Sequence, residues 1–457
     1  IGWALIMEYA VGNITVAISW SDYFTGLLES GGMHIPQWMQ MDYLTASNGF
    51  DEATALMQGG KSFENLSDNL KAAHTAWTTS PTLGSFHFVA DLPALLIIII
   101  ITYLVYRGMK ESRNASNLMV VVKLCIILLV IAVGVFYVDT ANWDPFAPNG
   151  VGGILKGVSA VFFAYIGFDA ISTTAEECEN PQRDLPRGMM WAIIICTVLY
   201  IVIALILTGV VPYNQLAVGE PLAFVFEQIN LPKMTFIISI SAVVAMASVL
   251  LVFQMGQPRI WLSMSRDGLL PKRFSKIHPK YKTPSFATIV VGFVVAIPAL
   301  FMNLTMVTDL CSIGTLFAFV LVCGGVLVLQ NKPDVQRGSF KTPYVNAGFV
   351  LPFLFLGALI YFYTSNALFS YLQFKNWSDF GQKIPSLIFW AFSIFLTVVS
   401  VPKKLSLIPT LGLLSCLYMM SEIPLQNWIY FGIWLLVGLV IYFTYSRKHS
   451  KLNEANT

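Results

Sequence analysis

Residues 161–188 read VFFAYIGFDAISTTAEECENPQRDLPRG, and this stretch decides the fold. An apolar segment of membrane length carries Gly167 and Asp169 near its middle and then enters a dense charged loop that contains prolines. A membrane helix interrupted halfway exposes backbone groups that hydrocarbon cannot satisfy, so such breaks are tolerated where they line a cavity. In transporters, broken helices of this kind form substrate sites. The stretch therefore indicates solute transport rather than catalysis or adhesion.

The composition identifies the class of protein. Hydrophobic residues make up 56% of the chain and charged residues only 11%, whereas a soluble domain has about 25% charged residues. Most of the apolar runs reach the ~20 residues that a membrane-spanning helix needs. We predict an all-α polytopic membrane protein embedded in a lipid bilayer, with twelve apolar segments at 2–27, 88–106, 116–138, 153–175, 188–211, 233–264, 284–302, 305–330, 346–366, 384–401, 405–420 and 426–446. The net charge of +2 gives no field that would attract nucleic acid.

The distribution of Lys and Arg predicts the orientation in the membrane. Most of these residues fall in alternate loops, above all in the basic loop 265–283, and cytoplasmic loops carry the excess of positive charge. Segment 29–86 is then extracellular and the tail is cytoplasmic. We predict a plasma membrane or bacterial inner membrane protein, with an organelle membrane as the alternative.

Segment 29–86 is the one large excursion from the membrane. We expect a solvated cap with one or two short helices, for example over 62–76. The six cysteines lie in or beside apolar segments without metal-ligand spacing, so they are expected to be small apolar filler. Motifs such as HExxH, GxSxG or a Walker loop are missing from the sequence. We therefore predict no enzymatic activity, no metal and no cofactor; the oligomeric state stays open.

The interrupted helix predicts a site for an amino group. Its first half ends with carbonyl groups that face the break and carry partial negative charge, while Asp169 is placed to cap the second half. Orphan carbonyls attract an ammonium group. The alternative is a kinked structural helix in which Asp169 only caps. The predicted substrate-binding residues are Phe163, Ala164, Tyr165, Ile166, Gly167, Phe168 and Asp169.

Two ionisable residues lie within other apolar segments. Lys123 is placed about eight residues into its segment, in VVVKLCIILLV, and an intramembrane ionisable group is by default a functional hypothesis. We predict that Lys123 takes up and releases a proton, with snorkelling to the surface as the alternative. Glu8, in IMEYAVG, is either a buried partner of a cationic substrate or a polar contact between helices.

The charged motif EECENPQRDLPRG and the basic loop 265–283 predict a gate on the cytoplasmic side. Opposite charges on two loops can form ion pairs that break and re-form during transport. A simple solvated loop is the alternative. The predicted gate residues are Glu176, Asp184, Arg187, Arg266 and Asp267.

Five stretches resemble one known family in order along the chain: GWALIMEYAVG (2–12), FFAYIGFDAISTTAEECENPQRDLPRG (162–188), GQPRIWLSMSRDGLLP (256–271), IGTLFAFVLVCGGV (313–326) and WIYFGIWLLVGLVIYFTYSRKHS (428–450). The sequence resembles the amino acid–polyamine–organocation superfamily, specifically its cationic amino acid transporter-like branch. The resemblance implies a LeuT-type inverted-repeat core of ten helices plus four further helices.

The same resemblance implies a division of the chain. Residue 1 would fall in the family's third helix, so the chain would hold twelve of fourteen helices. The family's first helix, which holds the substrate carboxylate, would precede residue 1, and we expect transport only from a chain that includes it. The expected parts are the first membrane helix at 1–28, the extracellular insert at 29–86, the rest of the core at 87–330, four peripheral helices at 331–446 and the cytoplasmic tail at 447–457.

The resemblance also implies the mechanism. Lys123 matches a lysine that takes the place of a sodium ion in proton-coupled relatives. Sodium-coupled relatives place two hydroxyl residues where Ala247 and Ser248 stand here, which favours protons. The predicted coupling residues are thus Lys123, Ser248 and Glu8.

We expect a secondary active transporter that imports amino acids with protons by alternating access. Arginine, lysine or ornithine and neutral amino acids such as alanine both remain open as substrates. The alternatives are a membrane amino acid sensor or scaffold without transport, and an exchanger of neutral amino acids or polyamines.

Overall fold

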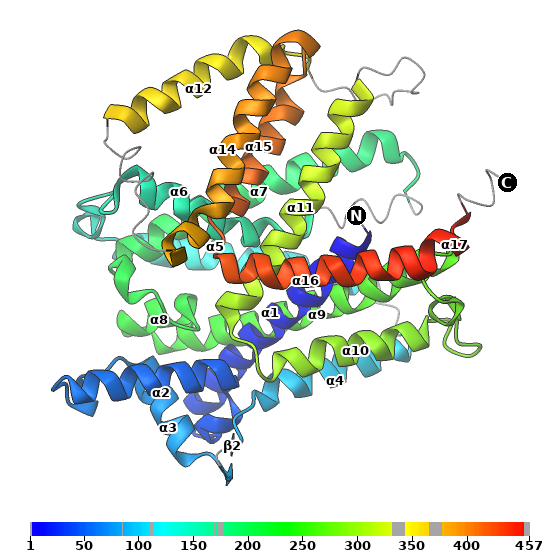
Figure 1. Ribbon diagram of the computed structural model, residues 1–457. Helices are drawn as coiled ribbons and strands as arrows, with labels where there is room; N and C mark the ends of the chain where they lie inside the picture. The colour runs from blue at the N-terminus through cyan, green and yellow to red at the C-terminus, as the bar shows by residue number, and fades with distance from the viewer. Residues whose placement is uncertain are drawn as a thin grey trace.

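The computed structural model describes residues 2–84, 86–108, 113–168, 171, 178–330, 343–364 and 377–451. These residues form an almost wholly helical fold (Figure 1). The main helices are α1 (Gly2–Ser30), α2 (Tyr43–Gln58), α3 (Asp68–Thr79), α4 (Leu92–Tyr106), α5 (Arg113–Gly134), α6 (Gly150–Val161), α7 (Pro181–Val210), α8 (Pro221–Gln228), α9 (Pro232–Arg266), α10 (Ser285–Ala299), α11 (Leu304–Gln330), α12 (Ala347–Thr364), α14 (Trp377–Lys403), α15 (Leu407–Ser421), α16 (Leu425–Ile441) and α17 (Arg447–His449).

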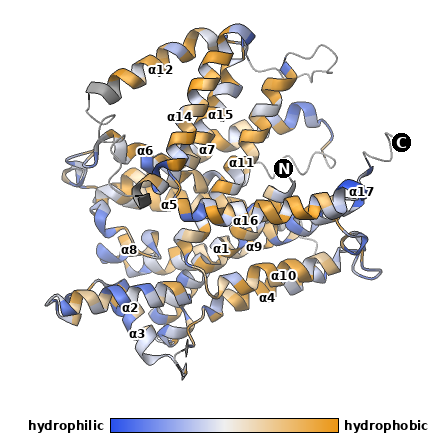
Figure 2. Ribbon diagram, viewed as in Figure 1, coloured by the Kyte–Doolittle hydropathy of each residue, from blue (hydrophilic) through white to orange (hydrophobic). Residues whose placement is uncertain are grey.

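The helices match the apolar pattern of the sequence. Each of the twelve predicted segments overlaps a helix, although within the segment 153–175 the continuous helix ends at Tyr165. Among the described residues, six helices are long and apolar enough to cross a membrane, and five shorter apolar helices accompany them. Many large apolar side chains are exposed, and Figure 2 shows that hydrophobic residues, in orange, predominate in most of the long helices. The all-α polytopic prediction is confirmed, while the number of spans stays a prediction.

The core forms where α1 packs along α9 and α11. Small residues permit this close approach: Gly12 lies against Phe253 and Cys311, and Gly256 lies against the ring of Tyr9. Gly2 lies against Met264, Tyr9 against Gly256 and Gly12 against Phe253, so α1 and α9 are antiparallel. Without a hydrophobic driving force in lipid, close packing of this kind is what holds membrane helices together.

A buried polar chain ties three helices together. The Asn13 side-chain amide of α1 donates to Gln254 of α9 at 2.6 Å, and Gln254 donates to the Thr102 hydroxyl of α4 at 2.9 Å. The methyl group of Thr102 lies against Gly292 of α10. Polar groups between membrane helices act as specific adhesive contacts. These hydrogen bonds therefore fix α1, α4 and α9 in register, with α10 beside them.

The last membrane helix is attached to the first helix described. Trp3 and Trp434 stack with ring centroids 4.5 Å apart. Each indole N–H donates to the other residue's backbone carbonyl, at 2.8 and 3.2 Å. Figure 1 shows α16 running across α1. Two further hydrogen bonds, from Ser446 Oγ to the Leu269 carbonyl (2.6 Å) and from Lys451 N to the Asp267 carbonyl (3.2 Å), join the chain's end to the loop after α9.

Residues 31–91 form a small lobe, here called the α2–α3 lobe. The prediction of a helix over 62–76 is partly met: α3 begins at Asp68, after an extended Ser67, and α2 is a second helix. Strands β1 (Thr82–Leu83) and β2 (Phe86–His87) pair antiparallel. Trp77 stacks on His87 at 4.2 Å in the centre of the lobe. The lobe is thus a packed unit rather than a loose loop.

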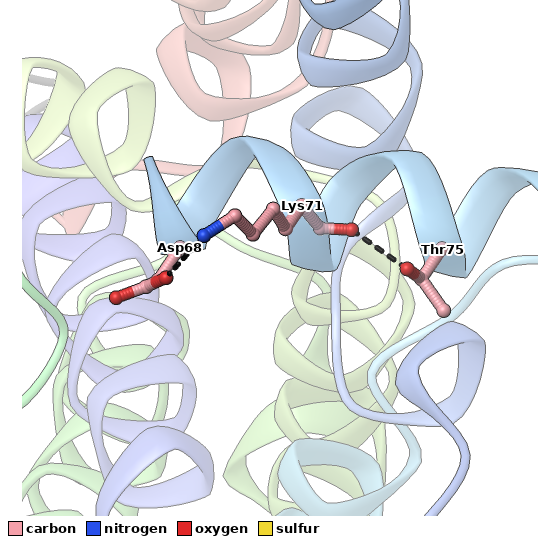
Figure 3. Close-up of polar contacts among 3 residues, drawn as sticks. All are labelled: Asp68, Lys71 and Thr75. Carbon is pink, nitrogen blue, oxygen red and sulfur yellow. Dashed lines mark hydrogen bonds and ion pairs between the residues drawn. The ribbon is translucent and has the colours of Figure 1, made fainter. Parts of the chain in front are cut away.

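Local polar contacts stabilise the two helices of the lobe. Asp42 caps α2 by accepting from Thr45 N at 2.8 Å, and burial raises the pKa of this carboxyl. In α3, Lys71 forms an ion pair with Asp68 at 3.2 Å, and Thr75 donates to the Lys71 carbonyl at 2.8 Å (Figure 3). The Asp68 side chain is exposed, so the ion pair contributes little to stability.

The loop between α7 and α8 is pressed against the end of α1. The Glu220 carboxylate occupies the space beside Gly26 where a side chain would lie, and Gly219 lies against Asp22. The lobe reaches the same loop through Asn69, which donates to the Ala217 carbonyl at 3.4 Å. Burial, then the charges of Glu227 and Glu29, raise the pKa of Glu220 to about 7.

Replacing Glu220 with glutamine should flatten the dependence of thermal stability on pH. The pKa of Glu220 rises from an ordinary 4.5 to about 7 on folding, so its stabilising contribution is complete below about pH 4.5 and is lost as pH rises through about 7. Glu220→Gln should remove a fall of about one to two degrees in Tm between pH 5 and 8, a small effect because half-buried Glu220 is screened by solvent. Glu64→Gln, at an exposed site, is the control. Equal slopes in the wild type and Glu220→Gln would contradict the assignment.

Candidate substrate site

The helix that begins with α6 ends at the predicted break. It tightens from α6 into a 3₁₀ turn over Phe162–Tyr165, and Ile166 is extended, with φ −61° and ψ 133°. Gly167 follows with φ +116°, and the space around its missing side chain is open. A φ of this size is accessible essentially to glycine alone. The chain therefore leaves the helix at Ile166 because glycine follows.

Helix α7 holds one side of the break. Tyr200 Oη donates to the Ala164 carbonyl at 2.8 Å, and Tyr165 Oη donates to Thr197 Oγ1 at 3.1 Å. The two tyrosine rings also meet edge to face at 5.3 Å. These contacts fix the direction of a carbonyl that the sequence assigns to the substrate site.

Helix α11 holds the other side of the break. Phe319 meets Phe162 edge to face with centroids 6.3 Å apart, and it meets Phe168 at 5.5 Å with the rings tilted by 46°. Phe162, Phe163, Ile166 and Phe319 all pack against the main core. The break is thus attached to the core and is not a free loop.

A groove of about 470 Å³ runs beside α6. Its lining is almost wholly apolar and consists of Ile154, Gly157, Val158, Val161, Phe162, Tyr165 and Met419. Ser159 donates to the Met419 carbonyl at 2.7 Å and so joins α6 to α15. A groove with this lining favours an apolar group over a charged one.

The predicted coupling residues lie on helices that pack against one another. Lys123 is partly buried on α5, and Ser248 is partly buried on the neighbouring α9. Glu8 is 1% exposed on α1, and its backbone carbonyl lies 3.5 Å from the Cys311 thiol. Their role in proton transfer stays a prediction. Asp169, the predicted cap of the second half-helix, lies outside the described residues.

The four predicted gate residues that the structure describes lie in the first turns of α7 and at the C-terminal end of α9. Asp184 lies in the first turn of α7 and forms an ion pair with the adjacent Arg183 at 3.6 Å. Arg266 lies in the last turn of α9, and Asp267 caps it. The negative charge of Asp184 at the N-terminus of α7 and the positive charge of Arg266 at the C-terminus of α9 suit the helix dipoles. Arg187 is exposed on α7, Glu176 lies outside the described residues, and the gate stays a prediction.

Sequence reasoning missed three residues that hold the break. Thr197 and Tyr200 are three residues apart in an otherwise apolar run, which places them on one helix face. That spacing is a usable signal for a polar contact. Phe319 carries no such signal, because it is one of 33 phenylalanines and only the three-dimensional packing distinguishes it.

Comparison with known proteins identifies similar chains. Residues 1–380 match the family model described as amino acid permease, and residues 402–450 match the model of the C-terminus of such permeases. The branched-chain amino acid permease BcaP of Bacillus subtilis (strain 168) is 36% identical over 99% of this chain and 77% of its own length. The methylthioribose transporter of the same organism is 35% identical over the same shares. The vacuolar cationic amino acid transporter 4 of Arabidopsis thaliana is 29% identical over 100% of this chain and 79% of its own.

Proposed function

Since this chain belongs to the amino acid permease family, whose members are membrane transporters and not enzymes, we propose that it imports amino acids together with protons by alternating access. Amino acid transport across a membrane is the coarser function that the family carries. The direction of transport, the proton and the mechanism are the proposed part.

The break after α6 is the observation that carries the proposal. The 3₁₀ turn ends at Tyr165, and the glycine conformation at Gly167 turns the chain away from the helix. Carbonyl groups at a helix end carry partial negative charge and accept hydrogen bonds from an ammonium group. We therefore propose that the substrate amino group binds at the carbonyls between Phe163 and Gly167, with Phe168 and Asp169 completing the site. The Phe163 and Ala164 carbonyls already accept from the Ile166 amide and from Tyr200 Oη, and each carbonyl keeps a second lone pair for the substrate.

Neutral amino acids with apolar side chains are the proposed substrates. The apolar groove begins at Phe162 and Tyr165 of the break itself, and a charged side chain would lose its hydration there without gaining a partner. The relative BcaP is named for branched-chain amino acids. The second candidate is a cationic amino acid paired with buried Glu8, in line with relatives named as cationic amino acid transporters.

Coupling to protons is proposed through Lys123, with Ser248 and Glu8 in support. Lys123 lies on α5, which packs against both α7 and α9. A change in its charge would thus act on the helix that holds the break and on the helix that packs along α1. The pairing of Glu176, Asp184 and Arg187 with Arg266 and Asp267 is proposed as the gate on the cytoplasmic side.

Topology is proposed from the positive charges of the loops. The α2–α3 lobe would face outward, and the tail 447–457 would lie in the cytoplasm beneath a plasma or bacterial inner membrane. The division of the chain into a core up to residue 330 and peripheral helices over 331–446 remains part of this proposal.

Uptake into proteoliposomes that contain the full-length protein tests the function. Radiolabelled leucine, lysine and methylthioribose would be supplied with and without an inward proton gradient. We expect leucine accumulation that depends on the gradient and collapses with a protonophore. Binding of leucine without uptake would instead support a sensor, gradient-independent counterflow alone would support an exchanger, and uptake of methylthioribose alone would overturn an amino acid substrate.

A further inference from the structure

We propose that Phe319 of α11 is a positioning residue that braces the break and sets the affinity of the substrate site. The inference rests on the proposed function, because it assumes that the carbonyls at the break hold the substrate. Phe319 lies on α11, a helix that contributes no residue to the predicted substrate site.

The brace is defined by two aromatic contacts of one ring. Phe162 opens the 3₁₀ turn and Phe168 follows Gly167, so the two residues flank the break. Phe319 contacts both, at 6.3 and 5.5 Å between centroids. A single side chain thereby contacts both edges of the segment in which the helix ends.

The ring is mounted on a rigid support. Its neighbours Thr315, Leu316 and Ala318 are buried on α11, and α11 packs along α1. Gly314 fits against Met7 and the Ala4 carbonyl at this interface. The position of the Phe319 ring is therefore set by the core and not by the break.

A movement of α11 should then change the positions of the carbonyls at the break, because Phe319 contacts the residues on both sides of it. If α11 tilts during transport, Phe162 and Phe168 must move with the ring or lose contact with it. Phe319 would couple the packing of the core to the width of the break without touching the substrate.

Helix α11 also supplies a matched control. Phe317 stands two residues before Phe319 and is likewise partly buried. Its ring meets Phe431 of α16 edge to face at 5.1 Å, away from the break. Removal of either ring takes a phenylalanine out of the same helix, but only one removal should affect substrate affinity.

Kinetics of leucine uptake in proteoliposomes test the brace. We expect Phe319→Ala to raise KM about ten-fold, the size of two lost aromatic contacts, with a change of less than about three-fold in Vmax. Phe319→Tyr, which keeps the ring, should stay near the wild-type KM. Phe317→Ala should leave KM unchanged within about two-fold. Similar KM shifts in both alanine variants, or none in Phe319→Ala, would overturn the inference.

Hydrogen–deuterium exchange provides a readout that does not depend on transport. The Ile166 amide donates to the Phe163 carbonyl at 3.1 Å inside the braced segment. Peptides that cover 162–168 should exchange faster in Phe319→Ala than in the wild type or Phe317→Ala. Unchanged exchange in Phe319→Ala would refute the brace even if KM rises. Faster exchange in a protein that neither binds nor moves amino acids would keep the brace and reject the proposed function.

Discussion

Replacement of Lys123 with alanine should abolish the accumulation of substrate against its gradient. Lys123 lies six residues into the apolar helix segment Asn117–Tyr137, about 9 Å along its axis, and Val122 and Leu124 beside it are 45% and 38% exposed. A charge within a hydrocarbon-facing stretch is costly and persists where function requires it. We expect proton-driven leucine uptake to fall by at least about ten-fold, while leucine–leucine exchange continues, because exchange needs the site but no net proton movement.

Two variants sharpen this test. Lys123→Arg keeps the positive charge but cannot release a proton at physiological pH, so it should fail in proton-driven uptake as alanine does. Lys156→Ala removes an exposed lysine from α6 and should behave like the wild type. Full proton-driven accumulation by Lys123→Ala would show that this residue does not couple the proton.

Replacement of Gly167 with alanine should strongly reduce transport without unfolding the protein. Its φ of +116° costs a residue with a side chain about 1–3 kcal/mol, which the segment can avoid only by changing the conformation of the break. Because the space around Gly167 is open, the penalty comes from the backbone and not from a clash. We expect leucine uptake to fall by about ten-fold or more, measured at equal amounts of reconstituted protein.

Gly152→Ala provides the comparison within α6. Gly152 is helical, has open space around it and is not part of the groove, and alanine favours a helix over glycine by up to about 1 kcal/mol. This variant should transport normally and keep or raise its Tm. If both glycine variants transport equally well, the backbone conformation at position 167 does not matter for the site.

Much of the architecture was predictable because a segment that crosses the hydrocarbon of a bilayer must satisfy its own backbone hydrogen bonds, as a helix does. Apolar runs of spanning length predicted the helices, and Gly167 within such a run predicted where one of them ends. Boundaries shifted where local capping decided them, as at α3, which begins after Ser67 rather than at residue 62.

The contacts around the break were not predictable in the same way. The bond from Tyr200 to the Ala164 carbonyl joins residues 36 positions apart, and Phe319 lies much farther along the chain from Phe162. Periodicity says which face of a helix is polar or bulky, but it does not say which other helix that face meets. The partner depends on crossing angles and on small residues such as Gly12 and Gly256.

The paired indoles of Trp3 and Trp434 carry a consequence for how the protein is made. Their two hydrogen bonds join residues 431 positions apart. During synthesis at the ribosome, Trp3 enters the bilayer long before Trp434 has been translated, so its indole N–H must wait for its final acceptor. The contact between α1 and α16 therefore forms only after α16 has been inserted. In any product that stops before α16, the Trp3 indole would lack this acceptor and its stacking partner.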